Sequence, residues 1–324
     1  MSSETLIDVT HLSRRYGPIQ AVSDISFKVS RGEVLGFLGP NGAGKSTTMQ
    51  MLTGNLAPSH GSIKICGIDL LDKPKEAKAQ IGYLPEQPPV YRELTVDEYL
   101  TFCARINRIP KHQIANARTR AKERCGLNDV SRRLIGNLSK GYQQRVGIAQ
   151  AIIHSPAIVV LDEPTVGLDP IQIREIRSLI RELSQEHGVI LSTHILPEVQ
   201  MTCDRVQIIS RGHLVYNDSM ANLNQQTAAS SVVVSLSDPV SDNDLMALPD
   251  IQRVDQLGPQ RWRLHFQPDT QPTPAIAKAI IDQGWQLLEL TPEHKTLEQI
   301  FVDITTAEEI AAHHKETESA EAAA

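Results

Sequence analysis

The stretch from Gly39 to Thr47, which reads GPNGAGKST, constrains the fold more than any other part of the sequence. It matches the phosphate-loop pattern G-x-x-x-x-G-K-[ST] and stands between an apolar strand at 34–38 and a helix-like run at 46–53, as that pattern requires. Glycines let the backbone turn tightly with its N–H groups inward, Lys45 can reach the β and γ phosphates, and Ser46 can offer a hydroxyl to Mg²⁺. The competing interpretation is a plain glycine-rich turn, but residue usage predicts the bare pattern by chance in about one chain in a hundred of this length.

Composition places few limits beyond those of an ordinary globular protein. A chain of 324 residues predicts two domains, and a net charge of −6 gives no basic excess for nucleic acid. Residues 1–10 lack the regions of a signal peptide, and no stretch approaches 18 consecutive apolar residues, so we expect neither export of the chain nor a membrane span. The 4 cysteines lack metal-ligand spacing, which predicts reduced packing residues in a cytosolic protein.

Two stretches ahead of the phosphate loop, 6–12 and 25–29, alternate apolar and polar residues as half-buried antiparallel strands do. Between them, 14–18 predicts a turn that carries Tyr16. This ring can stack on a purine, a contact that adds about 0.5–1.5 kcal/mol beyond burial, although a tyrosine at a strand end is more often a packing residue. Its position one hairpin upstream of the loop favours the binding interpretation.

The chain between about 86 and 150 predicts an inserted helical lobe. Thr-Val-Asp-Glu at 95–98 has the form of a capping box, and a second helix at 111–125 is ended by a glycine. A further helix at 142–153 follows Ser139, its expected N-cap. A capped helix start behind a glycine is a second anion site, but by itself it is an ordinary helix start.

Polar residues follow two apolar runs further along the chain. The run at 158–161 is continuously apolar, as in a strand buried on both faces of a largely parallel sheet, and it ends at Asp162 and Glu163. These carboxylates are therefore expected in the crevice where α/β proteins bind ligands. A strand at 188–192 ends next to Thr193 and His194; the chain has 11 histidines, and only the strand-end position singles out His194.

In this order and spacing, the phosphate loop, the upstream aromatic, Leu-Ser-x-Gly-x-Gln at 138–143, the strand with Asp-Glu, Gly-Leu-Asp at 167–169 and the strand-end histidine resemble the ATP-binding subunit of an ABC transporter over roughly residues 5–220. Three segments are similar to single-cassette exporter ATPases of bacteria, the group of gliding-motility, antibiotic and sodium export subunits: 81–86, 138–142 and 161–170. The resemblance implies an α/β fold, the P-loop NTPase of ABC type, with a mixed sheet core, an antiparallel β subdomain and an inserted helical subdomain.

Roles in ATP hydrolysis also follow from the resemblance and from the chemistry of the residues. Lys45 and the loop amides position and neutralise the phosphates, Ser46 and Asp162 hold Mg²⁺ directly or through water, and His194 contacts the γ-phosphate. Glu163 acts as general base, a role worth about 10²–10⁴-fold in rate. The residues expected to contact ATP are Tyr16, Gly39, Pro40, Asn41, Gly42, Ala43, Gly44, Lys45, Ser46, Thr47, Glu86, Gln87, Ser139, Gly141, Gln143 and Asp169.

The chain departs from the superfamily at two places. Where most members have a glutamine this chain has Glu86, with Gln87 one place later, so the contact to Mg²⁺ or water stays open between these two residues. In the signature segment, Lys140 and Tyr142 replace the commoner glycine and glutamine, as they do in the exporter group, and we expect function to survive.

Assembly follows from the signature segment. In the family, the residues that match Ser139 and Gly141 face the γ-phosphate on the opposite subunit, so two complete sites need two chains, and a head-to-tail dimer with Asp169 at its interface is the expected ATP-bound state. Separate polytopic membrane subunits must supply the channel, which places this chain in the cytoplasm on the inner face of the cell membrane. A short helix of that partner is expected to dock near 86–91 and the helix at 95–107; a plain connecting loop is the alternative.

The composition changes after residue 223. Strands and helices in the order β-α-β-β-α-β fit a small ferredoxin-like domain, with a possible closing helix at 296–304. The expected elements are strands at 231–236, 251–257, 261–266 and 285–290 and helices at 242–248 and 274–283. We therefore divide the chain into an ATP-binding domain at 1–223, an accessory domain at 228–306, for regulation, dimer support or structural extension, and a flexible tail at 307–324.

Two other functions compete with transport. A non-transport ABC ATPase that regulates a cytosolic or membrane-associated complex would carry the same site, but translation factors join two cassettes and repair factors insert long coiled coils, and neither pattern occurs in this sequence. A nucleotide-dependent regulator or kinase would need neither the signature segment nor His194. The cargo is chosen by the membrane partner, and export rests on the resemblance alone.

Overall fold

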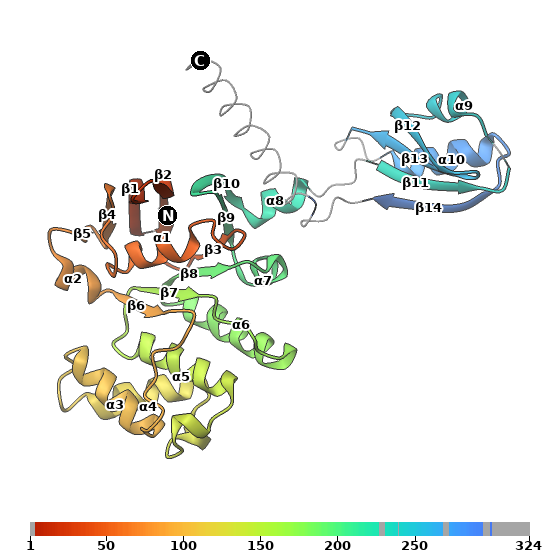
Figure 1. Cartoon of the computed structure of the whole chain (residues 1–324). Coiled ribbons are helices and arrows are strands. Elements are labelled where there is room, and N and C mark those ends of the chain that lie inside the picture. Colours follow the sequence, from red (N-terminus) through yellow and green to blue (C-terminus); the bar gives the residue numbers. More distant parts are fainter. Residues whose placement is uncertain (1–3, 227–230, 239, 268–271, 294–298, 300–324) are drawn as a thin grey trace, which may run out of the picture. The chain divides into compact units, whose positions relative to one another are not determined.

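The computed structural model describes residues 4–226, 231–238, 240–267, 272–293 and 299, and the chain divides into two compact units, Met1–Met220 and Ala221–Ala324. Each unit has a hydrophobic core of its own (Figure 1). The helix expected at 296–304, apart from Gln299, and the tail expected at 307–324 lie outside the described residues.

A six-stranded mixed sheet is the centre of unit 1. Its order is β10 (His213–Ser219), β9 (Arg205–Ser210), β3 (Val34–Leu38), β8 (Gly188–Thr193), β7 (Ile158–Asp162) and β6 (Ile81–Leu84). All neighbouring pairs are parallel except β10 with β9. The residues of β3, β7 and β8 are all buried, as continuous apolar runs in a doubly covered sheet require, so the predicted mixed core is confirmed.

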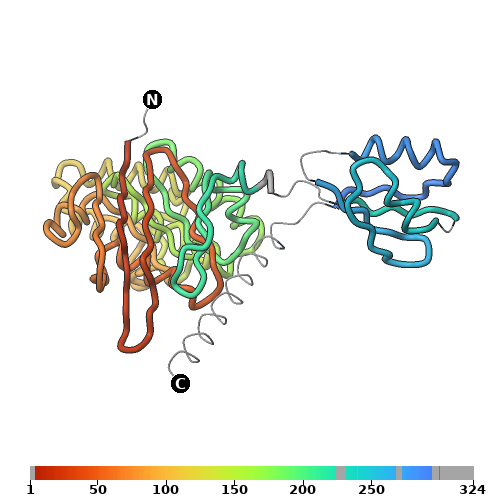
Figure 2. The backbone as a smooth tube through the Cα atoms, turned by 90° about the horizontal axis from the view of Figure 1, so that it is seen from above, coloured from red at the N-terminus to blue at the C-terminus, as the bar shows by residue number. Residues whose placement is uncertain are grey.

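An antiparallel sheet covers this core. Its order is β2 (Ile19–Ser30), β1 (Thr5–Tyr16), β4 (His60–Ile65) and β5 (Ile68–Asp69), and β1 with β2 forms a long hairpin along one side of unit 1 (Figure 2). Helix α1 (Lys45–Leu52) lies between the two sheets, where Met49, Met51 and Leu52 join their cores (Figure 1). The phosphate loop, which connects β3 to α1, is thereby fixed at a seam between two packed layers.

The turn predicted at 14–18 is shorter than the sequence indicated. Strand β1 continues through Tyr16, which pairs with Ile19, so only Gly17 and Pro18 form the turn. Register shifts between Val9 and Arg15 let the twisted hairpin continue past the point where the apolar alternation stops.

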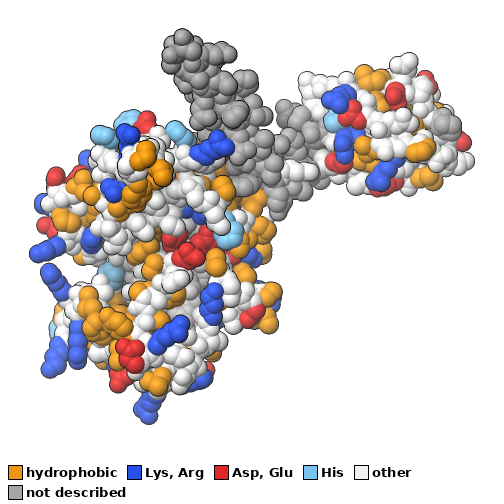
Figure 3. Space-filling view, in the orientation of Figure 1, with side chains coloured by type: hydrophobic (Ala, Val, Ile, Leu, Met, Phe, Trp, Pro, Cys, Tyr) orange, Lys and Arg blue, Asp and Glu red, His pale blue; other side chains and the backbone are white. Residues whose placement is uncertain are grey.

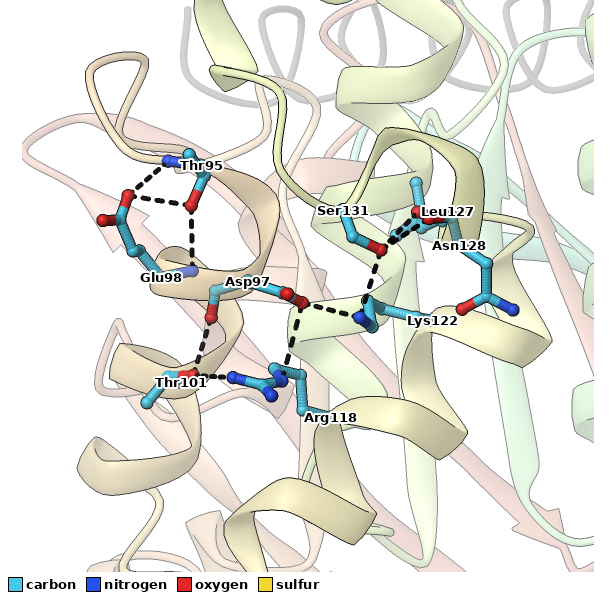
Figure 4. Close-up of polar contacts among 9 residues, drawn as sticks. All are labelled: Thr95, Asp97, Glu98, Thr101, Arg118, Lys122, Leu127, Asn128 and Ser131. Atoms are coloured by element: carbon cyan, nitrogen blue, oxygen red, sulfur yellow. Dashed lines mark hydrogen bonds and ion pairs between the residues drawn. The ribbon is translucent and has the colours of Figure 1, made fainter.

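The inserted lobe contains α3 (Val96–Ile106), α4 (Ile114–Cys125) and α5 (Lys140–Ile152), with 3₁₀ turns at Asn128–Val130 and Ile135–Asn137. The capping box is confirmed, because Thr95 accepts from the Glu98 amide while Glu98 bonds back to the Thr95 amide (Figure 4). Hydrogen bonds from the Thr95 amide and hydroxyl to the Glu98 carboxylate hold the pKa of that carboxyl below its usual value. Gly126 ends α4 in the left-handed conformation, as predicted.

The remaining elements of unit 1 include several that the sequence interpretation did not assign. These are α2 (Pro74–Lys78), α7 (Leu196–Thr202) and the strands β9 and β10. Helix α6 (Pro170–Ser184) follows Asp169, and α8 (Met220–Gln226) begins at the last residue of unit 1. The pair β9–β10 extends the mixed sheet beyond β3.

Unit 2 is a four-stranded antiparallel sheet with two helices on one face. The elements are β11 (Ser231–Leu236), α9 (Asp242–Met246), β12 (Ile251–Gly258), β13 (Arg261–Phe266), α10 (Thr273–Asp282) and β14 (Leu287–Glu293), and the strand order is β12-β13-β11-β14. Leu245, Ile276 and Ile280 from the helices pack on Trp262 and its neighbours in the sheet. The last strand begins later than the predicted 285, because the Trp285 amide still bonds to the Ile280 carbonyl at the end of α10.

Candidate functional site

The carboxyl ends of β3, β7 and β8 meet at one edge of the mixed sheet, and a cleft of about 330 Å³ opens there. Parallel strands bring their carboxyl ends to the same edge, so residues far apart in the sequence converge. The cleft is lined by Ala21, Asn41, Gly42, Gly44, Lys45, Ser46, Thr47, Glu86, Glu163, Val166 and His194. Most of the predicted phosphate loop, the expected general base and the strand-end histidine therefore share one cleft.

The loop is packed so tightly that two of its glycines have no room for a side chain. A Cβ on Gly39 would lie 2.3 Å from the Ile209 carbonyl oxygen, and a Cβ on Gly44, whose φ is 110°, would lie 2.6 Å from the Ala21 carbonyl oxygen. No side chain caps the start of α1. The first-turn N–H groups of a helix have no partner within the helix, so an anion at this end meets unpaired donors and a favourable dipole.

Lys45 is buried and points back into the loop. Its ammonium donates to the Gly39 carbonyl at 2.8 Å and the Pro40 carbonyl at 3.2 Å, and it lies 3.7 Å from Oε1 of Glu163. Only 6% of the Lys45 side chain and 8% of the Glu163 side chain are exposed. A buried cation with a carboxylate at this distance can exchange that carboxylate for a phosphate, which offers a stronger charge-assisted bond.

Glu163 has an unusual backbone conformation. Its φ of 50° lies in the left-handed region that a residue with a Cβ seldom adopts, and its amide donates to the Ser192 carbonyl on the neighbouring strand. Both carboxylate oxygens lie 3.0 Å from Nδ1 of His194, whose side chain is 42% exposed. Strain of this kind persists where the surroundings fix it, and it is common at functional sites.

Asp162 offers what a Mg²⁺ ion needs. Burial raises the pKa of its carboxyl, and the nearby hydroxyls of Ser192 and Ser46 counteract part of that effect. In hydrogen-bonding geometry its buried Oδ1 has no partner among the described residues. Those residues contain no cluster of three or more His, Cys, Asp or Glu side chains.

Several expected contact residues line no part of this cleft. Gly39, Pro40 and Ala43 form the inner turn of the loop, where the Ala43 amide donates to the Pro40 carbonyl. Tyr16 is 42% exposed, with the Arg14 guanidinium 4.7 Å from its ring centroid. Gln87 is also exposed and absent from the lining, whereas Glu86 is present.

Ser139 of the signature segment and Asp169 each lie at the start of a helix. Ser139 is the N-cap of α5, as predicted, and accepts from the Tyr142 amide; the Gln143 side chain donates to the Leu138 carbonyl at 2.9 Å. Gly141 packs against Gln172 at the start of α6. Asp169 is the N-cap of α6 and accepts from two amides at 3.0 Å. None of these residues lines the cleft of its own chain.

Comparisons with known proteins agree with this geometry. The family described as "ABC transporter" matches residues 22–166. The ABC transporter ATP-binding protein YxlF of Bacillus subtilis is 31% identical over 93% of this chain and 100% of that protein, and the bacitracin transport ATP-binding protein BcrA of Bacillus licheniformis is 36% identical over 93% and 97%. The chain belongs to the ABC transporter family.

This ABC transporter subunit also matches solved structures. One described as the ATP binding subunit of an ABC transporter has a TM-score of 0.62 and 32% identity, and covers 68% of this chain and 92% of that chain. The chain is thus an ATP-binding subunit of a bacterial ABC transporter and energises transport together with membrane partner subunits. Within the described residues, no helix combines the length and apolar character needed to span a bilayer.

Sequence reasoning missed residues that shape the site. Ala21 and Val166 line the cleft, and small or apolar residues carry no signal of such a role. Beneath it, the fully buried Glu198 accepts hydrogen bonds from Thr165 and, at 2.8 Å, from Thr193. This carboxylate bonds to the segment after β7, which carries Glu163, and to the end of β8, next to His194. The link joins residues that are distant in the sequence, so only the structure shows it.

Proposed function

We propose that this subunit hydrolyses ATP in the cleft at the carboxyl edge of the mixed sheet, with Glu163 as general base. The observation that carries the proposal is the convergence of Lys45, Glu163 and His194 around one cleft of about 330 Å³. Export is the proposed direction, which rests on the resemblance to the exporter group; one relative is named for bacitracin transport. The cargo is left to the membrane partner.

Lys45, Glu163, His194 and the residues that would hold Mg²⁺ have different parts in the reaction. Lys45 moves its interaction from Glu163 to the β and γ phosphates, which frees the carboxylate to accept a proton from the attacking water. His194, 3.0 Å from that carboxylate, orients it and contacts the γ-phosphate. Bound Mg²⁺ would neutralise phosphate charge, held by Ser46 and by the unpaired Oδ1 of Asp162.

We assign the contact that the sequence left open to Glu86 rather than Gln87. Glu86 lines the cleft, and its charge helps to raise the pKa of Asp162, whereas Gln87 is exposed outside the lining. A carboxylate in this position can hold the ion's water as a glutamine amide would, with an added charge interaction. Tyr16 is proposed as the adenine contact, because its exposed ring lies at the end of the hairpin whose Ala21 lines the cleft.

A second copy of the chain would complete the site. Ser139, Gly141, Gln143 and Asp169 lie outside the cleft of their own chain, although the first of them starts a helix that can receive an anion. In a head-to-tail dimer these residues would face the γ-phosphate on the partner, and ATP would stabilise closure.

The membrane partner is proposed to dock on the helical lobe near 86–91, which would hold the subunit at the inner face of the membrane. Tyr91 is 47% exposed and packs edge-on against Tyr99 and Phe102, and Ile106 is 62% exposed on the same helix as Phe102. Tyr91→Ala together with charge reversal at Glu93 should uncouple ATPase from transport. Unchanged coupling would argue against this surface.

We propose a ferredoxin-like accessory domain at 228–306, after an ATP-binding domain at 1–223 and before a flexible tail at 307–324. The element order of unit 2 and its antiparallel sheet with β11 in the interior support this class. Deletion after residue 223 should leave ATP binding intact if unit 1 carries the whole site.

Light scattering with ATP and Mg²⁺ tests the reaction and the assembly together. Glu163→Gln should lose hydrolysis and double its mass only with ATP, while the control Glu123→Gln, an exposed carboxylate on α4, should behave as wild type. Ser139→Glu should neither dimerise nor hydrolyse. A mixture of Glu163→Gln and Ser139→Glu should regain turnover that neither variant has alone, because each mixed dimer contains one intact site, built from Glu163 of one chain and Ser139 of the other. Glu163→Gln that stays monomeric and hydrolyses ATP would remove this proposal.

A further inference from the structure

A second hollow in unit 1 lies away from the ATP cleft. Its volume is about 770 Å³, more than twice the 330 Å³ of the cleft. One wall is α2 with residues 153–155, which precede β6 and β7; the other is the end of α3 with the first part of α4. The hollow therefore lies at the amino ends of β6 and β7, at the opposite edge of the sheet from the phosphate loop.

The charge of this hollow has one sign. Lys75, Lys78, Arg108 and Arg120 line it, and no Asp or Glu is among its lining residues. Within the described part of the chain, none of these cations forms an ion pair. Figure 3 shows Lys and Arg side chains gathered along the edge where α2 and the ends of α3 and α4 lie. We call this hollow, lined by these residues, the basic groove.

On helix α4, the cations outside the groove form ion pairs with carboxylates. Arg118 and Lys122 both lie beside Asp97, at 3.5 and 2.6 Å, and Figure 4 shows the two cations turned toward that carboxylate. Arg124 pairs with Glu186 at 2.5 Å. Arg120, on the same helix, instead donates to the Ser155 hydroxyl across the groove. The helix thus pairs its other cations with carboxylates at 3.8 Å or less, whereas Arg120 lines the groove and interacts with the charge of Glu186 only at longer range.

Arg108 occupies a position where the backbone favours glycine. Its φ is 59°, its amide donates to the Arg105 carbonyl, and the next amide, of Ile109, donates to the Ala104 carbonyl. These bonds define a Schellman motif in which Arg108 is the C′ residue. Glycine is the usual residue at C′, and this chain instead has an arginine there, whose side chain lines the groove.

Neutral donors complete the walls. Asn107, Gln113 and Asn116 line the groove with side-chain amides. His154 also lines it, but its Nε2 donates to the Ile81 carbonyl at 3.2 Å, so its buried Nδ1 is an acceptor and offers no hydrogen bond to a phosphate. The groove therefore combines fixed positive charge with several polar groups at hand for an acceptor-rich ligand.

We propose that the basic groove binds a soluble polyphosphate, either inorganic or carried by a nucleoside. Lysine and arginine are the residues that recognise phosphate, and a chain of phosphates matches a row of cations better than a single phosphate does. The volume is in the range of small-molecule sites. Bound there, the ligand links α2 and residues 153–155 of the core to α3 and α4 of the lobe, and it restrains the lobe against the core. This site is independent of the ATP cleft.

Calorimetric titration with tripolyphosphate tests the proposal in the full chain carrying Lys45→Ala, which removes the cation of the phosphate loop. The expected result is one bound ligand per chain. Adding Lys78→Ala and Arg120→Ala should weaken binding about 100-fold, at about tenfold for each cation. The charge-matched control, Lys64→Ala with Arg132→Ala on exposed cations elsewhere, should change the affinity less than about twofold.

Arg108→Gly separates binding from folding. Glycine suits the C′ position, so the melting temperature should not fall, yet binding should weaken about tenfold. Hydrogen exchange at 106–110 and 153–155 should slow with tripolyphosphate. The proposal is overturned if the Lys45→Ala chain binds no tripolyphosphate, if the control weakens binding as much as the groove variant, or if only phosphatidic acid vesicles bind in a groove-dependent way, which would assign a lipid headgroup.

Discussion

Two buried lysines, each beside a carboxylate, distinguish the ATP cleft from the helical lobe. In the lobe, Lys122 lies 2.6 Å from Asp97 and 3.1 Å from the Ser131 hydroxyl (Figure 4). In the cleft, Lys45 lies 3.7 Å from Glu163, whose backbone is strained. The Lys122–Asp97 pair is close, whereas the Lys45–Glu163 pair is long and Asp162 Oδ1 has no hydrogen-bond partner among the described residues. Charges that serve stability are satisfied within the chain, whereas charges that serve a ligand are left incompletely satisfied.

Glu163→Gln should have the largest effect, and it tests whether the charges of the cleft serve the ligand. Turnover should fall by about 10²–10⁴-fold, because an amide cannot accept the proton of the attacking water. ATP binding should persist, since Lys45 loses only a competitor for the phosphates. Steady-state ATPase assays with nucleotide-binding measurements check this, and a fall in affinity without a fall in turnover would place Glu163 in binding instead of chemistry.

Lys122→Met tests whether the close ion pair of the lobe serves stability. Removing the cation leaves Asp97, whose side chain is 27% exposed, with only Arg118 nearby, so the free energy of unfolding should fall by about 2 kcal/mol. ATP affinity should stay as in wild type. Denaturant unfolding measures the loss, and Lys64→Met, an exposed lysine without an ion pair in the described structure, is the matched control. A Lys122 variant of wild-type stability would show that this pair is not what holds α3 to α4.

Asp162→Asn should raise stability while it removes Mg²⁺-dependent turnover. Burial raises the pKa of Asp162 in the folded state, so its contribution to stability is present below the usual pKa and is lost as pH rises through the folded pKa. The variant should therefore melt about 2–4 °C higher at neutral pH, and this advantage should shrink in acid. Thermal melts across pH measure the difference between the two proteins. A difference that does not change with pH would contradict the assignment.

Thr95→Ala should have the smallest effect. It removes the side chain that caps α3 and should lower the free energy of unfolding by about 1 kcal/mol, with no change in ATP affinity. Thr95→Ser, which keeps the capping hydroxyl, should behave nearly as wild type. If Thr95→Ala altered ATP affinity, the stability of the lobe and ligand binding in the cleft would not be independent of each other.

Local chemistry explains why much of this structure was predictable. The phosphate loop, the capping box at Thr95 and the N-cap at Ser139 each depend on neighbours within a few residues, and the continuous apolar runs of β7 and β8 indicate buried parallel strands. These signals predicted the fold and the positions of Asp162, Glu163 and His194 at the carboxyl ends of their strands. The resemblance to ABC transporter subunits then supplied the roles.

Features that depend on distant contacts were not predictable. Glu198 bonds Thr165 and Thr193 across two strand ends, and nothing near Glu198 in the sequence indicates that it is buried. The left-handed conformation of Glu163 depends on the bond from its amide to β8. The basic groove assembles cations from α2, from the turn after α3 and from α4, which are separate in the sequence. In each case the signal is spatial.

Thermal unfolding of Lys45→Met, with and without ATP and Mg²⁺, shows whether this buried lysine serves the ligand or the stability of the fold. If Lys45 serves the ligand, the variant without nucleotide should melt within a few degrees of wild type and should lose the stabilisation that bound ATP gives. Lys122→Met, run beside it, should melt lower and keep that stabilisation. A Lys45→Met protein that melts as low as Lys122→Met and is still stabilised by ATP would contradict the account.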